Sequence, residues 1–333
     1  MNKPLVSVLM PTFNADYFIE ESVRSITNQT YHNLQIIIID DGSTDKTSNI
    51  INQFKDNRIR FIKHEKNQGL IFTLNEGIKL CTGKYIARMD ADDISELNRI
   101  ECQVDFMEDH PDVGILGTAV QNIGTFNNIV RYPQTDDEIR WKILYTCCFS
   151  HPSVMLRTFV IRKFNLEYNP VYDHAEDYEL WPRLLQYCKG YNLETPLLRY
   201  RIHPKNVSKL YEQTQLQNSL LVIQQQFHRM GLYITFDEVK LFREFANSNF
   251  SFDAHEIHLL TSLIDRIILN KKMPEYSKRM IVQRLWHLMQ NNKNISWNKK
   301  YSYFNNIKSF NSSYLPGFWE IKSLLKHIIL KLS

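Results

Sequence analysis

The chain has 333 residues, of which 43% are apolar and 23% charged, a composition that is typical of a globular protein and excludes a fibrous or disordered one. The net charge of +4 is divided unevenly, with 23 Lys and Arg against 27 Asp and Glu up to residue 205 and 17 against 9 beyond it. Five cysteines without a Cys-x-x-Cys pair argue against a disulfide framework or a zinc site, and no apolar run approaches the roughly 18 residues of a membrane span.

Short β-branched or apolar runs alternate with amphipathic stretches up to about residue 204. We expect strands at 6–10, 35–39, 60–63 and 85–89, and helices at 17–28, 43–54, 69–80 and from the end of the fourth strand through 107. Ser43 or Thr44 is the expected cap of the second helix. This alternation predicts an α/β fold with a mostly parallel sheet, in which ligands bind beyond the carboxyl ends of the strands.

Helical periodicity replaces the strand pattern beyond Asn206, which predicts two domains, 1–207 and a mainly helical 208–333. One helical face is formed by Ile257, Leu260, Ile264, Ile267 and Ile268. The segment 319–332 has an apolar face opposite three lysines, and this pattern fits either contact with an anionic membrane or packing on the rest of the protein. The basic residues are accompanied by no nucleic-acid-binding motif, so we expect no nucleic-acid partner.

The densest acidic cluster follows the fourth expected strand, where Asp90, Asp92 and Asp93 lie within four residues. Carboxylates this close repel one another unless a cation lies among them, and Mg²⁺ or Mn²⁺ prefers oxygen ligands. In an extended segment Asp90 and Asp92 would point to the same side and share one ion. Asp93 is expected to cap the next helix, and because capping needs only one carboxylate, we favour a metal site for the cluster.

Two acidic pairs are further candidates. Asp40 and Asp41 end the second expected strand; a turn and a helix cap would not need both carboxylates, and a carboxylate here can accept an N–H of a nucleobase. Glu176 and Asp177 open an aromatic helix. Taken alone this second pair is explained by the helix dipole, although a partly buried carboxylate there would suit a general base.

The histidines and one tryptophan give weaker signals. His64, His110 and His255 have no partner at metal-ligand spacing, and we interpret them as surface or capping residues. His151 fits the lining of an acceptor pocket and a buried turn equally well. Trp181, which follows the second acidic pair, is expected in the core.

Seven short motifs occur in a fixed order between about residues 4 and 208. They are Pro11-Thr-Phe-Asn14, Asp40-Asp-Gly-Ser43, Asn67-Gln-Gly69, Asp90-Ala-Asp92, His151-Pro-Ser-Val-Met155, Glu176-Asp177 and Tyr200-Arg-Ile-His203. The set resembles the family-2 group of inverting, nucleotide-sugar-dependent glycosyltransferases with the GT-A fold. Any single motif is weak, but the ordered set is specific.

The resemblance implies a nucleotide site near the ends of the first two strands. Phe13 would stack on the nucleotide base, and Asp41 would contact uracil. Pro11 and Asn67 belong to the motifs that would line this site. UDP is the commonest nucleotide of such enzymes, so the resemblance implies a UDP-sugar as the donor.

The resemblance also implies a reaction centre that depends on Mn²⁺ or Mg²⁺. Asp90 and Asp92 match the motif for the metal and the ribose, with Asp92 as the more direct metal ligand. His203 matches a position near the diphosphate or the metal. Asp177 matches the catalytic base, which would remove the proton of the acceptor hydroxyl in a single displacement that inverts the anomeric carbon.

The implied acceptor is a glycan or a lipid-linked saccharide in the synthesis of lipopolysaccharide, capsule or exopolysaccharide, at the cytoplasmic face of the membrane or in the cytoplasm. One alternative is a phosphohydrolase of the haloacid-dehalogenase type, because the run from Asp90 to Ile94 resembles its nucleophile loop. That loop normally follows the first strand, whereas here the run follows the fourth. A non-catalytic scaffold is the other alternative, and it would need none of the carboxylates at 41, 90, 92 and 177.

Overall fold

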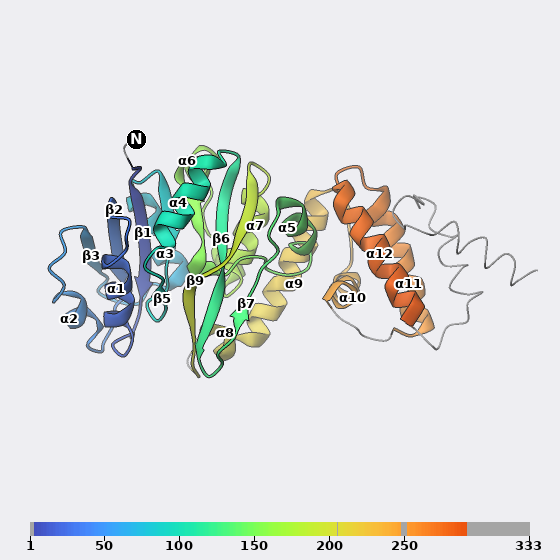
Figure 1. Ribbon diagram of the computed structural model, residues 1–333. Coiled ribbons are helices and arrows are strands. Elements are labelled where there is room, and N and C mark those ends of the chain that lie inside the picture. Colours follow the sequence, from blue (N-terminus) through green and yellow to red (C-terminus); the bar gives the residue numbers. More distant parts are fainter. Residues whose placement is uncertain (1–2, 205, 248–251, 292–333) are drawn as a thin grey trace, which may run out of the picture. The chain divides into compact units, whose positions relative to one another are not determined.

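The computed structural model describes residues 3–204, 206–247 and 252–291 (Figure 1). Their contacts form two compact units, one reaching from the N-terminus to 143 and from 147 to 222, the other comprising 144–146 and the residues from 223 on. The predicted boundary at 207 precedes helix α9 (Glu212–Arg229), and this division falls within it. Within the described residues, no helix has the length and apolarity to span a membrane. The basic amphipathic segment 319–332 lies outside the described residues.

One nine-stranded sheet forms the centre of the first unit. Its strands are β1 (Val6–Thr12), β2 (Leu34–Asp40), β3 (Ile59–Lys63), β4 (Tyr85–Arg88), β5 (Ile94–Ser95), β6 (Val113–Gly124), β7 (Ile129–Val130), β8 (Met155–Arg157) and β9 (Lys189–Ile202). The order is β3-β2-β1-β4-β8-β6-β9-β5, with β7 paired to β6. The first four strands are parallel, as predicted, whereas β8 pairs antiparallel with both β4 and β6.

Helices connect and cover these strands (Figure 1). They are α1 (Ile19–Thr27), α2 (Thr47–Ile51), α3 (Leu70–Leu80), α4 (Arg99–Asp109), α5 (Asp136–Lys142), α6 (Thr158–Lys163), α7 (Glu176–Leu184), α8 (Val207–Leu210) and the start of α9, with 3₁₀ turns η1 (His151–Ser153) and η2 (Pro170–Tyr172). Each of the four expected helices in the region up to 109 is present, although α2 is shorter than predicted. The alternation of strand and helix therefore follows the sequence pattern.

Two predicted helix caps are wrong. Helix α2 begins at Thr47 after Lys46, and the Ser43 hydroxyl instead accepts the Asn14 backbone N–H at 2.8 Å. Helix α4 begins at Arg99, because strand β5 intervenes between the acidic cluster and the helix. Asp93 is buried before β5, where its Oδ1 accepts the backbone N–H of Arg201 at 2.8 Å.

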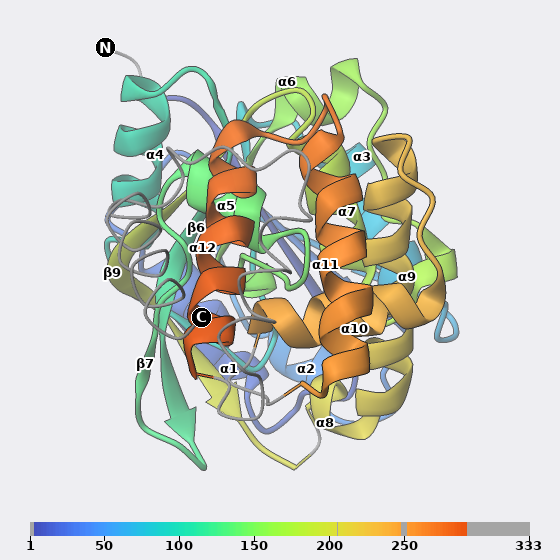
Figure 2. The ribbon, with the colours of Figure 1, turned by 90° about the vertical axis from the view of Figure 1, so that its right-hand side faces the viewer.

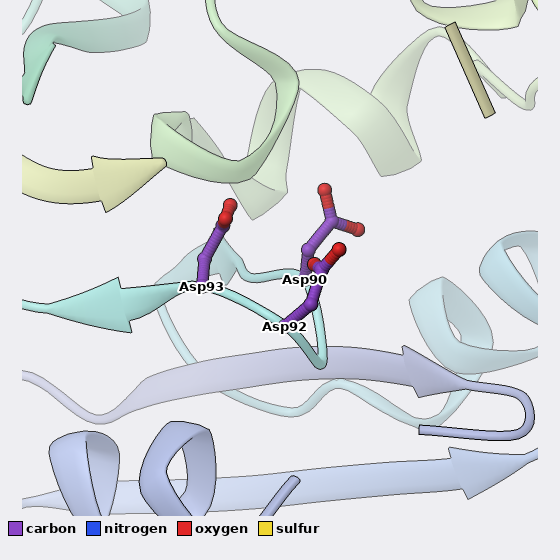
Figure 3. A group of neighbouring side chains, drawn as sticks. All are labelled: Asp90, Asp92 and Asp93. Carbon is purple, nitrogen blue, oxygen red and sulfur yellow. The ribbon is translucent and has the colours of Figure 1, made fainter. Parts of the chain in front are cut away.

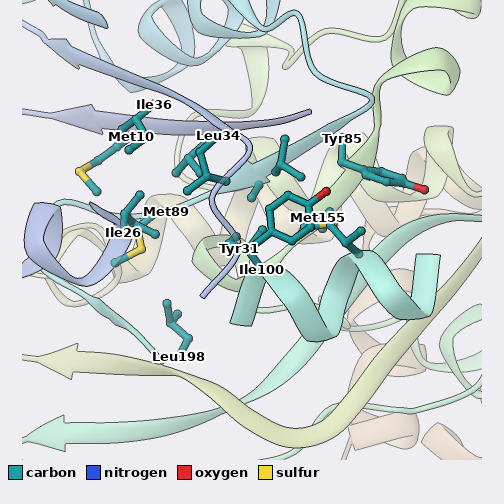
Figure 4. Packing of buried hydrophobic residues seen from close by; sticks show 14 of the residues in the cluster. Met10, Ile26, Tyr31, Leu34, Ile36, Tyr85, Met89, Ile100, Met155 and Leu198 are labelled. Carbon is teal, nitrogen blue, oxygen red and sulfur yellow. The ribbon is translucent and has the colours of Figure 1, made fainter. Parts of the chain in front are cut away.

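The core of the first unit lies on the faces of β1, β2 and β4. The isoleucines 36 to 39 are fully buried, as expected for a strand covered on both faces. Figure 4 shows Met10, Ile36 and Met89 packed together in this core. Burial of each such side chain contributes about 1.5–3 kcal/mol relative to exposure, and the resulting rigid sheet fixes the positions of the loops at its carboxyl edge. Trp181 is also fully buried, so the prediction that it belongs to the core is confirmed.

The second unit is helical, as predicted for the part of it that the structure describes. It contains α10 (Phe236–Asn247), α11 (Ala254–Leu269), α12 (Glu275–Asn291) and the end of α9. The predicted apolar face 257–268 lies on α11, and its five residues are at most 4% exposed. An Asp253–Glu256 capping box starts this helix. Helices α11 and α12 lie side by side in both views (Figures 1 and 2).

Candidate active site

Three loops of the candidate site follow neighbouring parallel strands. Phe13 follows β1, Asp41 follows β2 and Asp90 follows β4, and β1 lies between the other two. The carboxyl ends of these strands therefore meet at one edge of the sheet. Neighbouring strands are about 4.8 Å apart, so the ends of β2 and β4 are separated by about 10 Å.

A cavity of about 710 Å³ opens at this edge. All seven residues predicted for the nucleotide and the metal line it, namely Pro11, Phe13, Asp41, Asn67, Asp90, Asp92 and His203. Phe13 is 48% exposed, which leaves its ring free to contact a ligand. His203 reaches the cavity from the segment after β9 and stacks on Phe18, with ring centroids 5.1 Å apart. The structure therefore brings together residues that the sequence spreads over almost two hundred positions.

The acidic pair after β2 is held by protein donors. Asp40 is fully buried, and its carboxylate accepts the Ser43 backbone N–H at 2.9 Å and the Ser48 hydroxyl. Asp41 Oδ1 accepts the Gln68 backbone N–H, and Oδ2 accepts that of Gly69, each at 2.8 Å. Asp40 thus holds the turn into α2, and Asp41 fixes the loop that leads into α3.

His64 is a third partner of Asp41 and corrects our interpretation of it as a surface or capping residue. Its Nδ1 lies 2.7 Å from Asp41 Oδ1, and its Nε2 lies 2.7 Å from Glu76 Oε2 on α3. The sequence did not reveal this pairing because the three residues are separated by 23 and 12 positions. His110 does act at a helix end, since its Nδ1 is hydrogen-bonded to the Phe106 carbonyl near the end of α4.

The acidic cluster after β4 is different, because its carboxylates crowd one another. Oxygens of Asp90, Asp92 and Asp93 all lie within 4.8 Å of one another. Figure 3 shows Asp90 and Asp92 projecting together from the turn between β4 and β5. A turn, and not the alternation of an extended segment, brings these two side chains together.

Few protein donors compensate this charge. The Arg88 guanidinium lies 2.5 Å from Asp90 Oδ2, and His203 Nε2 lies 3.0 Å from Asp92 Oδ2. Asp93 Oδ2 is buried and has no hydrogen-bond partner among the described residues. Burial and the Asp90 charge raise the pKa of Asp92, and burial with both neighbours raises that of Asp93 well above its usual range. Oxygen ligands with excess negative charge fit a hard divalent cation.

A second cavity, of about 380 Å³, adjoins the first, and Leu70, Asp90 and His174 line both. It contains Asp177 and Glu176 from the start of α7. His151 also lines it from η1 and is hydrogen-bonded to the Tyr168 hydroxyl at 2.8 Å, so this residue belongs both to a buried turn and to a cavity wall. The predicted base, Asp177, therefore lines the same cavity as Asp90 of the predicted metal site.

The surroundings of Asp177 suit a proton acceptor. Its Oδ1 accepts its neighbour's backbone N–H at 2.6 Å, and its Oδ2 lies 3.7 Å from the Cys147 thiol. Burial raises the pKa of Asp177, although the Tyr178 N–H, Arg88 and Cys147 oppose this effect. Burial and the Asp177 charge raise the pKa of Glu176 to about 8, so one member of the pair is protonated near neutrality.

Sequence reasoning missed three further residues of these cavities. Arg88 is 3% exposed and lies in the wall of the second cavity, and a single arginine in an otherwise apolar strand was a usable signal. His174 has a positive φ of 63° and stacks on Tyr211, with ring centroids 4.0 Å apart. Tyr211, which lies between α8 and α9, is the third missed residue. No sequence pattern indicates the positive φ of His174 or its contact with Tyr211.

Comparisons with known proteins agree with this geometry. The model of the family Glycosyl transferase family 2 matches residues 7–165. An uncharacterized glycosyltransferase of Haemophilus influenzae is 35% identical over 64% of this chain and 70% of its own length. The O-antigen biosynthesis glycosyltransferase WbnJ of Escherichia coli is 35% identical over 62% of this chain and 82% of its own.

Two solved structures share the fold at low sequence identity. S. aureus TarS 1–349 in complex with UDP has a TM-score of 0.54 at 17% identity and covers 86% of this chain and 80% of its own. The mannosyltransferase PcManGT from Pyrobaculum calidifontis, in complex with GDP-Man and Mn²⁺, has a TM-score of 0.52 at 15% identity and covers 100% of this chain and 82% of its own. The predicted GT-A fold class is confirmed, and the match includes the Asp90–Ile94 run on which the phosphohydrolase alternative rested.

Proposed function

Because the chain belongs to glycosyl transferase family 2, we propose that it transfers a sugar from a UDP-sugar to a hydroxyl of a glycan or lipid-linked saccharide, with inversion. The observation that carries the proposal is the pair of adjoining cavities with Asp90 in their common wall. The larger cavity suits the donor, and the smaller one suits the acceptor beside Asp177.

The donor fits the larger cavity by length and chemistry. Phe13 offers an exposed ring for stacking on a base, and Asp41 offers a hydrogen-bond acceptor about 10 Å from the end of β4. A nucleoside diphosphate placed in this way reaches from Asp41 to Asp90 and Asp92. TarS has been solved with UDP and PcManGT with GDP-Man, so both nucleotides occur among proteins of this fold.

The residues after β4 fit a divalent cation, Mn²⁺ or Mg²⁺. Asp92 and Asp90 would hold it, because their carboxylates face the larger cavity and their mutual repulsion calls for a positive charge. His203, next to Asp92, would orient that carboxylate. When bound, the ion would neutralise charge on the leaving diphosphate.

Asp177 would act as the base. Its carboxylate takes the proton of the acceptor hydroxyl while the acceptor oxygen bonds to the anomeric carbon and the bond from that carbon to the diphosphate oxygen breaks. Attack from the face opposite the leaving group inverts the anomeric carbon in one step, without a covalent sugar–enzyme intermediate. The raised pKa of Asp177 makes it a stronger base than an exposed aspartate.

We infer an acceptor from the synthesis of surface polysaccharide. WbnJ acts in O-antigen biosynthesis, and a similar role here would place the acceptor on lipopolysaccharide or another lipid-linked saccharide. The excess of Lys and Arg over Asp and Glu beyond residue 205 supports binding to an anionic membrane from the cytoplasmic side.

A calorimetric titration of the full chain tests the proposal. UDP, GDP, dTDP and CDP are titrated separately, each with Mn²⁺ and with a chelator. We expect UDP to bind and Mn²⁺ to tighten it at least tenfold, about 1.4 kcal/mol. Lack of binding to every nucleotide would contradict the proposal, and tight binding of a different nucleotide would correct the donor.

A further inference from the structure

Hydrogen bonding leaves Asp41 with little spare capacity. A carboxylate offers about four acceptor positions. Three are occupied, two on Oδ1 by Gln68 and His64 and one on Oδ2 by Gly69. The described residues thus leave one position, on Oδ2, for a ligand in the cavity that Asp41 lines.

The loop that Asp41 fixes is itself part of the cavity wall. Asn67 and Gly69 line the cavity, and the loop passes so close to Gly42 that a Cβ there would lie 2.6 Å from the Lys66 carbonyl carbon. Gly42 also has a φ of +77°, which favours glycine. The orientation of the Asp41 carboxylate and the position of this loop are therefore set together.

His64 contacts the same Asp41 oxygen, Oδ1, that accepts the Gln68 N–H. Its ring lies between Asp41 and Glu76, with one nitrogen 2.7 Å from each carboxylate, and its backbone N–H donates to the Asp40 carbonyl at 2.8 Å. Only the protonated ring donates from both nitrogens. Burial opposes the charged ring, but the hydrogen bonds to Asp41 and Glu76 outweigh it and raise the pKa of His64.

We propose that His64, held by Glu76, is a positioning residue of the nucleotide site that orients Asp41 so that one acceptor position remains for the base. This inference rests on the proposed function, in which Asp41 meets the base. A single free position matches the one imide N–H of uracil or thymine, whereas the two adjacent N–H groups of guanine would need two positions. His64 acts through Asp41 and is not expected to touch the nucleotide.

Nucleotide binding to the full chain tests the proposal. Calorimetry with Mn²⁺ compares UDP with pyrophosphate, which lacks a base, for the wild type, His64→Ala and His64→Gln. Glu65→Gln is the matched control, because Glu65 is the exposed neighbour of His64. We expect His64→Ala to weaken UDP about tenfold, the size of one charge-assisted hydrogen bond, and to leave pyrophosphate unchanged. Glutamine, which can donate to Asp41, should restore part of the UDP affinity.

The pH dependence separates positioning from simple support of the fold. The charged groups that contact the His64 ring among the described residues are Asp41 and Glu76, while Lys63, Glu65 and Lys66 are exposed chain neighbours. Because the pKa of His64 is raised, its double hydrogen bond is complete at low pH and is lost as pH rises through that pKa. The difference in UDP affinity between the wild type and His64→Gln should therefore shrink with rising pH, a comparison that cancels other titrating groups.

Each outcome decides between the two proposals. If the wild type binds UDP and His64→Ala binds it equally well, or loses pyrophosphate to the same degree, the role of His64 is refuted and the proposed function stands. If the wild type binds no nucleotide, both are refuted. Should His64→Ala fail to fold, Glu76→Gln replaces it, because Glu76 is partly exposed and the amide leaves His64 with one carboxylate partner instead of two. We then expect a loss of UDP affinity smaller than tenfold and no loss of pyrophosphate affinity. Unchanged UDP affinity would refute the proposal.

Discussion

Two acidic clusters follow β2 and β4, the strands on either side of β1, and they differ in how their charge is compensated. After β2, the oxygens of Asp40 and Asp41 accept hydrogen bonds from backbone N–H groups, a hydroxyl and His64. After β4, oxygens of three carboxylates approach one another within 4.8 Å, and no residue in the described part of the chain is hydrogen-bonded to one buried oxygen of Asp93. In sequence, both are runs of aspartates that directly follow an expected strand.

The difference shows what an acidic cluster needs before it is interpreted as a metal site. A carboxylate whose acceptor positions are filled by the protein has little left for an ion, and its loss costs stability or loop geometry. A carboxylate with open positions and raised pKa depends on a ligand for compensation. Asp177 belongs to the second kind, because its Oδ2 has the Cys147 thiol, a weak donor, as a hydrogen-bond partner at 3.7 Å.

The largest expected effect comes from Asp177→Asn. The amide cannot take the acceptor proton, so we expect transfer, measured as release of UDP from the sugar donor, to fall by about 10²–10⁴-fold. Calorimetry should show nearly unchanged UDP affinity, because Asp177 lines the other cavity. Asp137→Asn, on the exposed first turn of α5, is the control. Turnover near the wild-type rate would remove Asp177 as the base.

Asp92→Asn tests the open cluster. The substitution removes one negative oxygen where Asp90 and Asp92 would hold the cation, so the Mn²⁺-dependent part of UDP binding should fall by about tenfold or more. Calorimetry with Mn²⁺ and with a chelator separates this part from the rest. The chelator titration is an internal control, since it should give the wild-type affinity. A variant that keeps the full Mn²⁺ effect would show that the cluster does not hold the metal.

The free energy of unfolding should distinguish the two clusters, because a substitution in the cluster after β2 should lower it and one in the cluster after β4 should not. Asp40→Asn weakens hydrogen bonds that a buried carboxylate makes to Ser43 and Ser48, so the free energy of unfolding should fall by about 1–3 kcal/mol. Asp93→Asn keeps an oxygen for the Arg201 N–H. It replaces a buried carboxyl group whose pKa is raised well above its usual range, so that its charged form is costly at neutral pH. Without metal, its free energy of unfolding should be unchanged or higher. Denaturant unfolding in the presence of a chelator measures both, and an equal loss for the two variants would contradict the distinction.

The sequence predicted this architecture where local pattern decides it. The isoleucines of β2, the periodic face of α11 and the acidic start of α7 each follow from hydrophobic period or charge placement, and the structure has them where expected. The partners of the carboxylates could not be predicted in the same way. Which oxygens are filled depends on contacts between residues far apart in the chain, such as Asp93 with Arg201.

The same limit explains the errors at single residues. Asp93 looked like a helix cap because a following helix was expected at once, whereas β5 intervenes. His64 looked unpartnered because its partners lie on β2's end and on α3. Arg88 was overlooked although its charge inside an apolar strand was visible, since the strand pattern alone gave no reason to place it beside a cavity.

The smallest expected effect concerns the thiol beside Asp177. The Cys147 thiol helps to lower the pKa of Asp177 against the effect of burial, so Cys147→Ala should raise that pKa further. The base must be deprotonated to act. The acid limb of the plot of transfer activity against pH should therefore move to higher pH. Cys147→Ser keeps a hydroxyl donor and should leave the limb in place or move it slightly lower, because a hydroxyl donates more strongly than a thiol. Equal displacement in the alanine and serine variants would mean that the thiol acts through its volume and not through a hydrogen bond.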